Sequence, residues 1–271
     1  MKDKIHFSLI QMDIQLGNKI SNLSEIESLI VKSVQNVLKT HTHVICLPEL
    51  CTTGFDLKNH KTHAEKIPDG LTTDLFQNLA RKHKIHIIAS YIEKSMESYY
   101  NCAVIIDDQG QLLTKYRKVH LFPLKPMEES EYFMSGDNDD INSLITINGF
   151  KVGVLICFDL RFPEISRRLV LEGVDCIIYL AEFPRPRDDV WTTLLRARAM
   201  ENQIFVIGVN RVGEDDTISY FGKSIVIGPN GETINSGSTK EEIIQGILDP
   251  DLLNLAKKFI PTLSHRRPDQ Y

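Results

Sequence analysis

The sequence predicts an α/β fold in which two mixed β-sheets pack face to face and helices cover their outer sides. Three observations lead to this prediction. The first third of the chain alternates strand-like and helix-like segments, which is typical of α/β proteins. Later segments instead read as antiparallel hairpins with Gly-containing turns, and these exclude a simple parallel sheet. No composition break or low-complexity linker divides the 271 residues, so one domain spanning 1–271 is expected.

Composition narrows the class of protein. Hydrophobic residues make up 42% and charged residues 25% of the chain, which is ordinary for a globular protein with a sizeable core. The net charge of −5, without a basic cluster, argues against a nucleic-acid partner. We expect no membrane anchor, since the chain has no apolar stretch of spanning length and no signal-peptide-like start. Reduced thiols in the cytoplasm are the simplest interpretation of an odd number of scattered cysteines, namely Cys46, Cys51, Cys102, Cys157 and Cys176.

The N-terminal third contains a predicted strand–helix–strand–helix–strand series. Its first helix is expected after Ser21, because apolar residues recur at helical spacing as far as Leu38. Two overlapping capping-box signals, 22–25 and 24–27, support that start and leave its first residue open. The other elements are strands at 5–10, 43–47 and 85–91 and a helix at 71–84.

The rest of the chain mixes hairpins with further βα units. Segments 101–106 and 111–116 form one predicted hairpin, and Asn148-Gly149 joins 143–147 to 151–156 in another. The connection 119–140 is too long for a tight turn, so we expect it to form a lid or pocket wall. The remaining elements are helices at 163–172 and 188–202, strands at 174–180, 204–209, 224–227, 232–235 and 242–248, and a short helix with an extended tail from 249 onward.

Three polar residues stand at or just past the ends of apolar strands: Glu49, Lys118 and Cys157. Side chains at neighbouring strand ends of an α/β sheet converge on one crevice. A carboxylate, a fixed cation and a thiol together supply a base, an oxyanion stabiliser and a nucleophile for acyl transfer. Cys157 also precedes a predicted helix, where N–H groups favour a thiolate. Taken singly, each has a plainer interpretation, as a core thiol or a solvated loop charge.

The segments around these residues resemble the three signature blocks of the nitrilase superfamily of carbon–nitrogen hydrolases. They are LPEL at 47–50, YRKVHLF at 116–122 and CFDLRFPE at 157–164. The resemblance implies a four-layer α-β-β-α sandwich that forms a homodimer, with Glu49, Lys118 and Cys157 as the catalytic triad. It also implies a second active-site glutamate, best matched by Glu129, with Glu128 and Glu131 as competitors.

Later segments are similar to the bacterial ω-amidase-like branch of that superfamily. They are AEFPRPR at 181–187, RARAMENQ at 196–203 and NRVG at 210–213, and the tail 260–271 resembles members associated with methionine salvage. Two positions depart from the branch. Phe183 stands where a Trp is usual, and Val190 stands where a His commonly precedes Trp191. Both are expected beside the pocket, which leaves open a substrate different from that of the branch.

The resemblance implies hydrolysis of a small linear amide, such as the 2-oxo acid amide α-ketoglutaramate, through a Cys157 thioester with release of ammonia. Lys118 and the backbone N–H of Phe158 would hold the oxyanion. The substrate carboxylate would need a cation, for which Arg161 and Arg187 are candidates. For Arg161 we favour a structural ion pair with Asp159 or Glu164. The predicted substrate contacts are Phe158, Arg161, Glu182, Phe183 and Arg187.

Other functions stay open at this point. A nitrilase or an N-carbamoyl amidohydrolase would use the same chemistry, and a non-catalytic binding protein could use the same fold. A thiol-redox protein would need a resolving cysteine, and none lies at a telling spacing. We expect no metal and no other cofactor, because the pairs His41/His43 and His60/His63 lack a third ligand at plausible spacing.

Overall fold

Two six-stranded mixed sheets form the centre of the chain in the computed structural model, which describes residues 2–35, 42–141, 144–215 and 218–270. In order across the first sheet the strands are β14 (Glu242–Leu248), β1 (Ile5–Gln11), β2 (Thr42–Cys46), β3 (His86–Ser95), β4 (Ser98–Ile106) and β5 (Leu112–Arg117). In the second sheet they are β13 (Thr233–Ser236), β12 (Ile225–Ile227), β9 (Phe205–Asn210), β8 (Cys176–Ala181), β7 (Phe150–Ile156) and β6 (Ile145–Ile147). A separate hairpin joins β10 (Val212–Glu214) to β11 (Ser219–Phe221).

Each large sheet has parallel strands at its centre and antiparallel strands at its edges. In the first sheet β1, β2 and β3 are parallel, and β14, β4 and β5 pair antiparallel with their neighbours. In the second sheet β7, β8 and β9 are parallel, and β6, β12 and β13 are antiparallel additions. The parallel strands need helical crossovers, whereas the antiparallel ones arise from hairpins, which explains why the sequence carries both signals.

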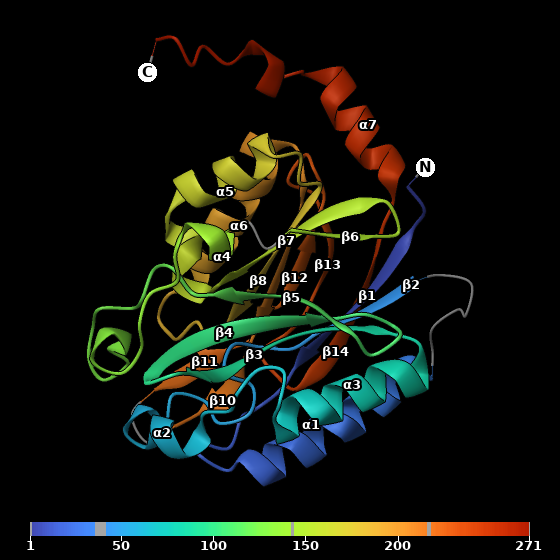
Figure 1. Ribbon diagram of the computed structural model, residues 1–271. Coiled ribbons are helices and arrows are strands. Elements are labelled where there is room, and N and C mark those ends of the chain that lie inside the picture. The colour runs from blue at the N-terminus through green and yellow to red at the C-terminus, as the bar shows by residue number, and fades with distance from the viewer. Residues whose placement is uncertain (1, 36–41, 142–143, 216–217, 271) are drawn as a thin grey trace.

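Helices cover the outer face of each sheet (Figure 1). The helices among the described residues are α1 (Lys19–Val34), α2 (His60–His63), α3 (Leu71–His83), α4 (Asn138–Ile141), α5 (Pro163–Leu171), α6 (Asp188–Asn202) and α7 (Pro250–Phe259). Helices α1 and α3 lie on the first sheet, and α5 and α6 lie on the second. Successive residues of a strand point to opposite faces of its sheet, and this produces the layers. In β1, Phe7 and Leu9 face the second sheet, while Ile10 packs with the α1 and α3 side chains. The predicted four-layer α-β-β-α arrangement is confirmed.

Several predicted boundaries differ from the observed ones. Helix α1 begins at Lys19 instead of after Ser21, because Asn18 is its N-cap and accepts from Ser21 N–H at 3.3 Å. Asn22 is instead buried, and its amide bonds the backbone of Gln15 and Thr52. The predicted helical positions Val37 and Leu38 and the strand start Ser143 lie outside the described residues, as do His41 and Tyr271.

Two hairpins were not foreseen. Strands β3 and β4 pair from Ile87 to Ser95 through a tight turn at Met96 and Glu97, although the prediction ended the first strand at Tyr91. The β10–β11 hairpin was also missed. The Asn148-Gly149 turn is present as predicted, with both residues at positive φ (48° and 83°), as a type I′ turn requires.

Candidate active site

The ends of three strands meet between the two sheets. Glu49 follows β2 and Lys118 follows β5 in the first sheet, while Cys157 follows β7 in the second. The first two side chains are fully buried and Cys157 is 7% exposed. The structure thus brings together the three residues that the strand-end argument selected.

Lys118 lies between two carboxylates. Its Nζ donates to Glu49 Oε1 at 2.7 Å and to Glu129 Oε2 at 2.5 Å. Burial by itself would lower the pKa of Lys118, but the Glu129 and Glu49 carboxylates outweigh it and raise the pKa above its ordinary value. Lys118 is therefore an ammonium group held in a water-poor site, as an oxyanion stabiliser should be.

The second glutamate of the cluster is Glu129. It is fully buried and accepts a further hydrogen bond from Phe122 N–H at 2.8 Å. Glu128 contacts Ser130 instead, at 3.4 Å, and Glu131 is exposed and pairs with Lys125. Of the three competing glutamates, only Glu129 reaches Lys118.

Asn101 of β4 completes the cluster and was missed by the sequence analysis. Its Nδ2 donates to Glu49 Oε1 at 2.8 Å and to Glu129 Oε1 at 2.9 Å, while its Oδ1 accepts from Ser90 Oγ at 2.9 Å. The available signal was a polar residue followed by the apolar run 102–106 of a buried strand, where an unsatisfied amide would be costly. Asn101 therefore fixes the two carboxylates relative to each other.

Cys157 begins a short 3₁₀ turn (Cys157–Arg161) and has a positive φ of 41°. Such a backbone conformation in a non-glycine residue is a form of strain found at functional sites. Burial first, and then the Glu49 carboxylate, raise the pKa of the thiol well above its ordinary value, and Lys118 opposes this only in part. Burial and Glu49 therefore favour the neutral thiol in the resting site, and a base has to remove the proton.

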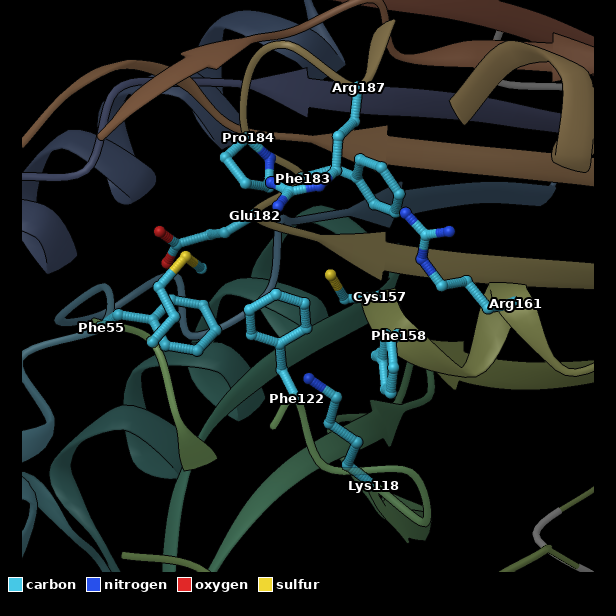
Figure 2. Close-up of a pocket in the computed structure, with 11 residues that line it drawn as sticks. Phe55, Lys118, Phe122, Cys157, Phe158, Arg161, Glu182, Phe183, Pro184 and Arg187 are labelled. Atoms are coloured by element: carbon cyan, nitrogen blue, oxygen red, sulfur yellow. The ribbon is translucent and has the colours of Figure 1, made fainter. Parts of the chain in front are cut away.

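A pocket opens above this cluster (Figure 2). It offers about 320 Å³ of space outside the atoms, part of which is open solvent. Its lining residues are Phe55, Lys118, Phe122, Met127, Cys157, Phe158, Arg161, Glu182, Phe183, Pro184 and Arg187. Figure 2 shows the Lys118 and Cys157 side chains directed into the same space. Phe122 and Met127 come from the long connection 119–140, which therefore supplies part of the pocket wall as predicted.

Two guanidinium groups lie at the pocket. Arg161 lies 5.7 Å from the Phe183 ring centroid and Arg187 lies 5.9 Å from that of Phe122. Neither arginine forms an ion pair within the described ranges. Arg161 thus pairs with neither of its two expected partners, Asp159 and Glu164; the Asp159 carboxylate bonds Tyr116 and His120 instead. Both cations are consequently available to an anionic ligand.

Glu182 and Arg211 form a buried, hydrogen-bonded pair beside the pocket. Arg211 Nη1 donates to Glu182 Oε2 at 2.7 Å, and Asp215 and the Ile14 carbonyl oxygen also accept from this guanidinium. The Glu182 backbone N–H donates to Glu49 Oε2 at 3.0 Å. Arg211 was not singled out as a site residue in the sequence, although it lies in the NRVG segment. The pair links the pocket wall to the predicted base.

The two positions that depart from the branch differ in placement. Phe183 lines the pocket and packs against Trp191 at 5.3 Å between ring centroids. Val190 is half-buried against the main core, and it is not among the described residues that line the pocket. Phe158 lines the pocket as expected and stacks edge-on against Phe122. Phe183 is thus the departure that shapes the pocket.

The histidine pairs have structural partners where they are described. His60 Nδ1 bonds the Leu57 carbonyl oxygen at 2.8 Å, and His63 Nε2 bonds Asp56 at 2.8 Å. Over residues 2–35, 42–141, 144–215 and 218–270, no group of three or more His, Cys, Asp or Glu side chains is arranged to hold a metal ion. Nor does a helix in these ranges have the length and apolar character needed to cross a membrane.

Comparisons with known proteins find relatives along nearly the whole chain. The sequence model of the family described as "Carbon-nitrogen hydrolase" matches residues 8–258. The chain is 35% identical to the 2-oxoglutaramate amidase of Bacillus subtilis over 266 residues, 97% of this chain and 98% of that protein. It is 33% identical to a protein of Pyrococcus abyssi named "Nitrilase" over 275 residues, 98% and 99% of the two chains. The crystal structure of Saccharomyces cerevisiae Nit3, a member of branch 10 of the nitrilase superfamily, superposes with a TM-score of 0.87 at 27% identity, covering 97% of each chain.

Proposed function

Because the chain belongs to the carbon–nitrogen hydrolase family, we propose that it releases ammonia from the side-chain amide of a 2-oxo dicarboxylic acid monoamide such as α-ketoglutaramate. The observation that carries this substrate class is the presence of Arg161 and Arg187 at a pocket whose floor is Cys157 and Lys118. Guanidinium groups bind carboxylates in bidentate geometry. The 2-oxoglutaramate amidase of B. subtilis supports the same class.

In the proposed acylation, Glu49 takes the Cys157 proton while the sulfur attacks the amide carbon. The raised pKa of the thiol makes this base necessary at neutral pH. The Lys118 ammonium and the backbone N–H of Phe158 stabilise the oxyanion, and losing one such donor typically costs about 2.7–4 kcal/mol. When the C–N bond breaks, the nitrogen takes the proton from Glu49 and leaves as ammonia.

In the proposed deacylation, Glu49 takes a proton from water, which attacks the thioester carbon. Collapse of the second tetrahedral intermediate breaks the C–S bond, releases the carboxylic acid and returns the proton to Cys157. Glu129 acts by holding Lys118, since the two groups lie 2.5 Å apart. Glu182 and Phe183 form the wall that confines the acyl chain.

We also infer a homodimer in the cytoplasm. Helix α7 exposes Leu255 and Phe259, and Figure 1 shows this helix and the tail extending away from the sheets. Apolar side chains on an extended helix are typical of a surface that another chain covers. The described cysteines are free and buried, as expected in a reducing compartment.

The substrate class is tested by measuring ammonia release from α-ketoglutaramate, glutamine, valeramide, the nitrile that corresponds to α-ketoglutaramate, and an N-carbamoyl amino acid. The highest kcat/KM is expected for α-ketoglutaramate, because its carboxylate and oxo group meet the two arginines. The nitrile is included because the P. abyssi relative is named a nitrilase. Faster turnover of the neutral amide, the nitrile or the N-carbamoyl compound would overturn the proposal.

The arginines are tested by Arg161→Met and Arg187→Met. Each is expected to raise KM for α-ketoglutaramate by about 10-fold or more, because a charge-assisted hydrogen bond is lost, while kcat/KM for valeramide stays unchanged. Arg185→Met is the matched control, since Arg185 lies in the same segment but pairs with Asp188 at 3.2 Å. An unchanged KM in either pocket variant removes that arginine from substrate binding.

A further inference from the structure

Lys118 and Cys157 are carried by different sheets, so their separation depends on how the two sheets are held together. Lys118 follows β5, an edge strand of the first sheet, and Cys157 follows β7 of the second. Strand pairing fixes neighbours only within a sheet. A thiol and an ammonium group that act on one carbonyl group need registration to a fraction of an ångström. The shared core and the Glu182–Glu49 hydrogen bond hold the sheets together, and a direct contact between the two segments adds local registration.

The contact is a buried carboxylate, Asp159. Its Oδ2 accepts from Tyr116 Oη at 2.7 Å and from Ile156 N–H at 2.9 Å. Its Oδ1 accepts from the His120 N–H at 3.1 Å and bonds His120 Nδ1 at 2.8 Å. Within the part of the chain that the structure describes, every hydrogen bond between segments 116–122 and 156–162 ends at Asp159. Two of its partners flank Lys118 and the third immediately precedes Cys157.

We propose that Asp159 is a positioning residue that sets the Cys157 thiol over the Lys118 ammonium by linking the two segments across the sheet interface. Asp159 is fully buried, so its bonds to Tyr116 and Ile156 form without competition from water and are costly to break one at a time. The His120 ring also stacks on the Phe162 ring, with 3.7 Å between the centroids and 8° between the ring planes. This stack joins the same two segments. This inference rests on the proposed function and adds a residue that acts through the triad.

The link has a consequence for the thiol. Lys118 lowers the pKa of Cys157 against the effects of burial and Glu49. If the link is cut, Cys157 moves relative to the ammonium and part of this lowering is lost. Alkylation of Cys157 then requires a higher pH, even with no amide present. A purely structural role of Asp159 would lower stability without moving this pH profile.

The test compares Tyr116→Phe with Tyr179→Phe. Both tyrosines are buried, and each hydroxyl makes one side-chain hydrogen bond, Tyr116 to Asp159 and Tyr179 to Ser166 at 2.6 Å. The Tyr116 hydroxyl also accepts from Val119 N–H, at 3.3 Å. Tyr116→Phe is expected to slow both iodoacetamide alkylation of Cys157 and amide turnover by about 10- to 100-fold and to shift the alkylation profile to higher pH. Tyr179→Phe is expected to leave both rates within about twofold of the wild type. Equal rates in the two variants would overturn the proposal.

A second pair of variants keeps the test decisive if Tyr116→Phe folds poorly. His120→Asn keeps a hydrogen-bond donor to Asp159 at the position of His120 Nδ1, so it is expected to retain the alkylation rate of Cys157. His120→Ala removes this donor and is expected to lower that rate. Loss in both, or in neither, contradicts the link. Alkylation needs no substrate, so its outcome is independent of the proposed function. A wild-type chain that alkylates readily but hydrolyses no amide refutes the function and leaves the link to be judged by the variants.

Discussion

Glu182 shows how a single buried carboxyl group can couple the pocket to pH. Burial raises its pKa from the ordinary 4.5 to about 8, although Arg211 lies 2.7 Å away and favours the charged form. The Glu49 and Asp215 carboxylates act in the same direction as burial. The folded chain therefore keeps a proton on Glu182 at pH values where the unfolded chain has released it.

We predict that Glu182 lowers the free energy of unfolding as pH rises from about 5 to about 8. The folded state binds more protons than the unfolded state in this window, so the slope is negative, up to about 1.4 kcal/mol per pH unit. Glu182→Gln cannot titrate and should show a flatter pH dependence. Urea unfolding of both proteins across the window measures the difference, and identical slopes contradict the raised pKa.

At the residue scale, the sequence could locate the reacting groups but not the network that holds them. Glu49, Lys118 and Cys157 follow apolar strands, and that local pattern was enough to place them at one crevice. Asn101 bonds Glu49 and Glu129, which are 52 and 28 residues away in sequence. Asp159 bonds Tyr116 and His120, which are 43 and 39 residues away. No local pattern records these contacts. Arg161 was assigned a structural ion pair because its partners in the folded chain were unknown.

At the scale of elements, a glycine in strand β9 allows helix α6 to pack closely against that strand. A Cβ built at Gly208 would lie 2.6 Å from both Leu195 Cδ1 and Trp191 Cζ2. The indole is held in place, since Trp191 Nε1 donates to the Lys223 carbonyl oxygen at 3.0 Å. Its other neighbour is Phe183 in the pocket wall. Packing of this helix and the shape of the pocket are consequently coupled.

We predict that Gly208→Ala lowers the free energy of unfolding by about 1–3 kcal/mol through overpacking and also raises KM, because Trp191 has to shift against Phe183. Gly153→Ala in β7 is the control. There the nearest atom is Leu169 Cδ1 at 3.0 Å, the end of a flexible side chain, so a smaller loss is expected. Thermal unfolding and steady-state kinetics of both variants provide the comparison, and equal losses would refute the explanation.

Element prediction succeeded where periodicity and turn chemistry agreed. The bounds of α6 and β14 were predicted as observed, and the Asn148-Gly149 hairpin formed as expected. The β3–β4 hairpin was missed because its turn residues, Met96 and Glu97, carry no Asn, Gly or Pro signal. The start of α1 was misplaced because Asn22, which resembles a cap, is used to hold a loop.

At the scale of the whole molecule, the order of the strands could not be read from local patterns. Strand β14, from the end of the chain, pairs with β1, and β12 lies beside β9. Periodicity predicts which segments are strands but not which of them become neighbours, because pairing is decided by distant contacts. The mixture of hairpins and βα units nevertheless limited the fold to two mixed sheets, and the resemblance supplied the four layers.

The inferred dimer gives a prediction at this scale. Phe259 and Leu255 of α7 are 80% and 58% exposed. A double Leu255→Ser/Phe259→Ser variant is expected to shift the sedimentation coefficient from dimer to monomer, because it removes apolar area that the second copy covers. Met96→Ser is the control, since Met96 is 91% exposed at the β3–β4 turn. A wild-type chain that sediments as a monomer would refute the dimer.

The central claim is that Cys157 carries the acyl group. It is tested most directly by intact mass spectrometry of the chain quenched during turnover of α-ketoglutaramate, with ammonia measured in the same samples. The predicted result is a mass increase equal to the acyl group on Cys157, at least one ammonia released per acylated chain, and at least about 1,000-fold slower ammonia release by Cys157→Ala. Ammonia release by Cys157→Ala at the wild-type rate would contradict the claim.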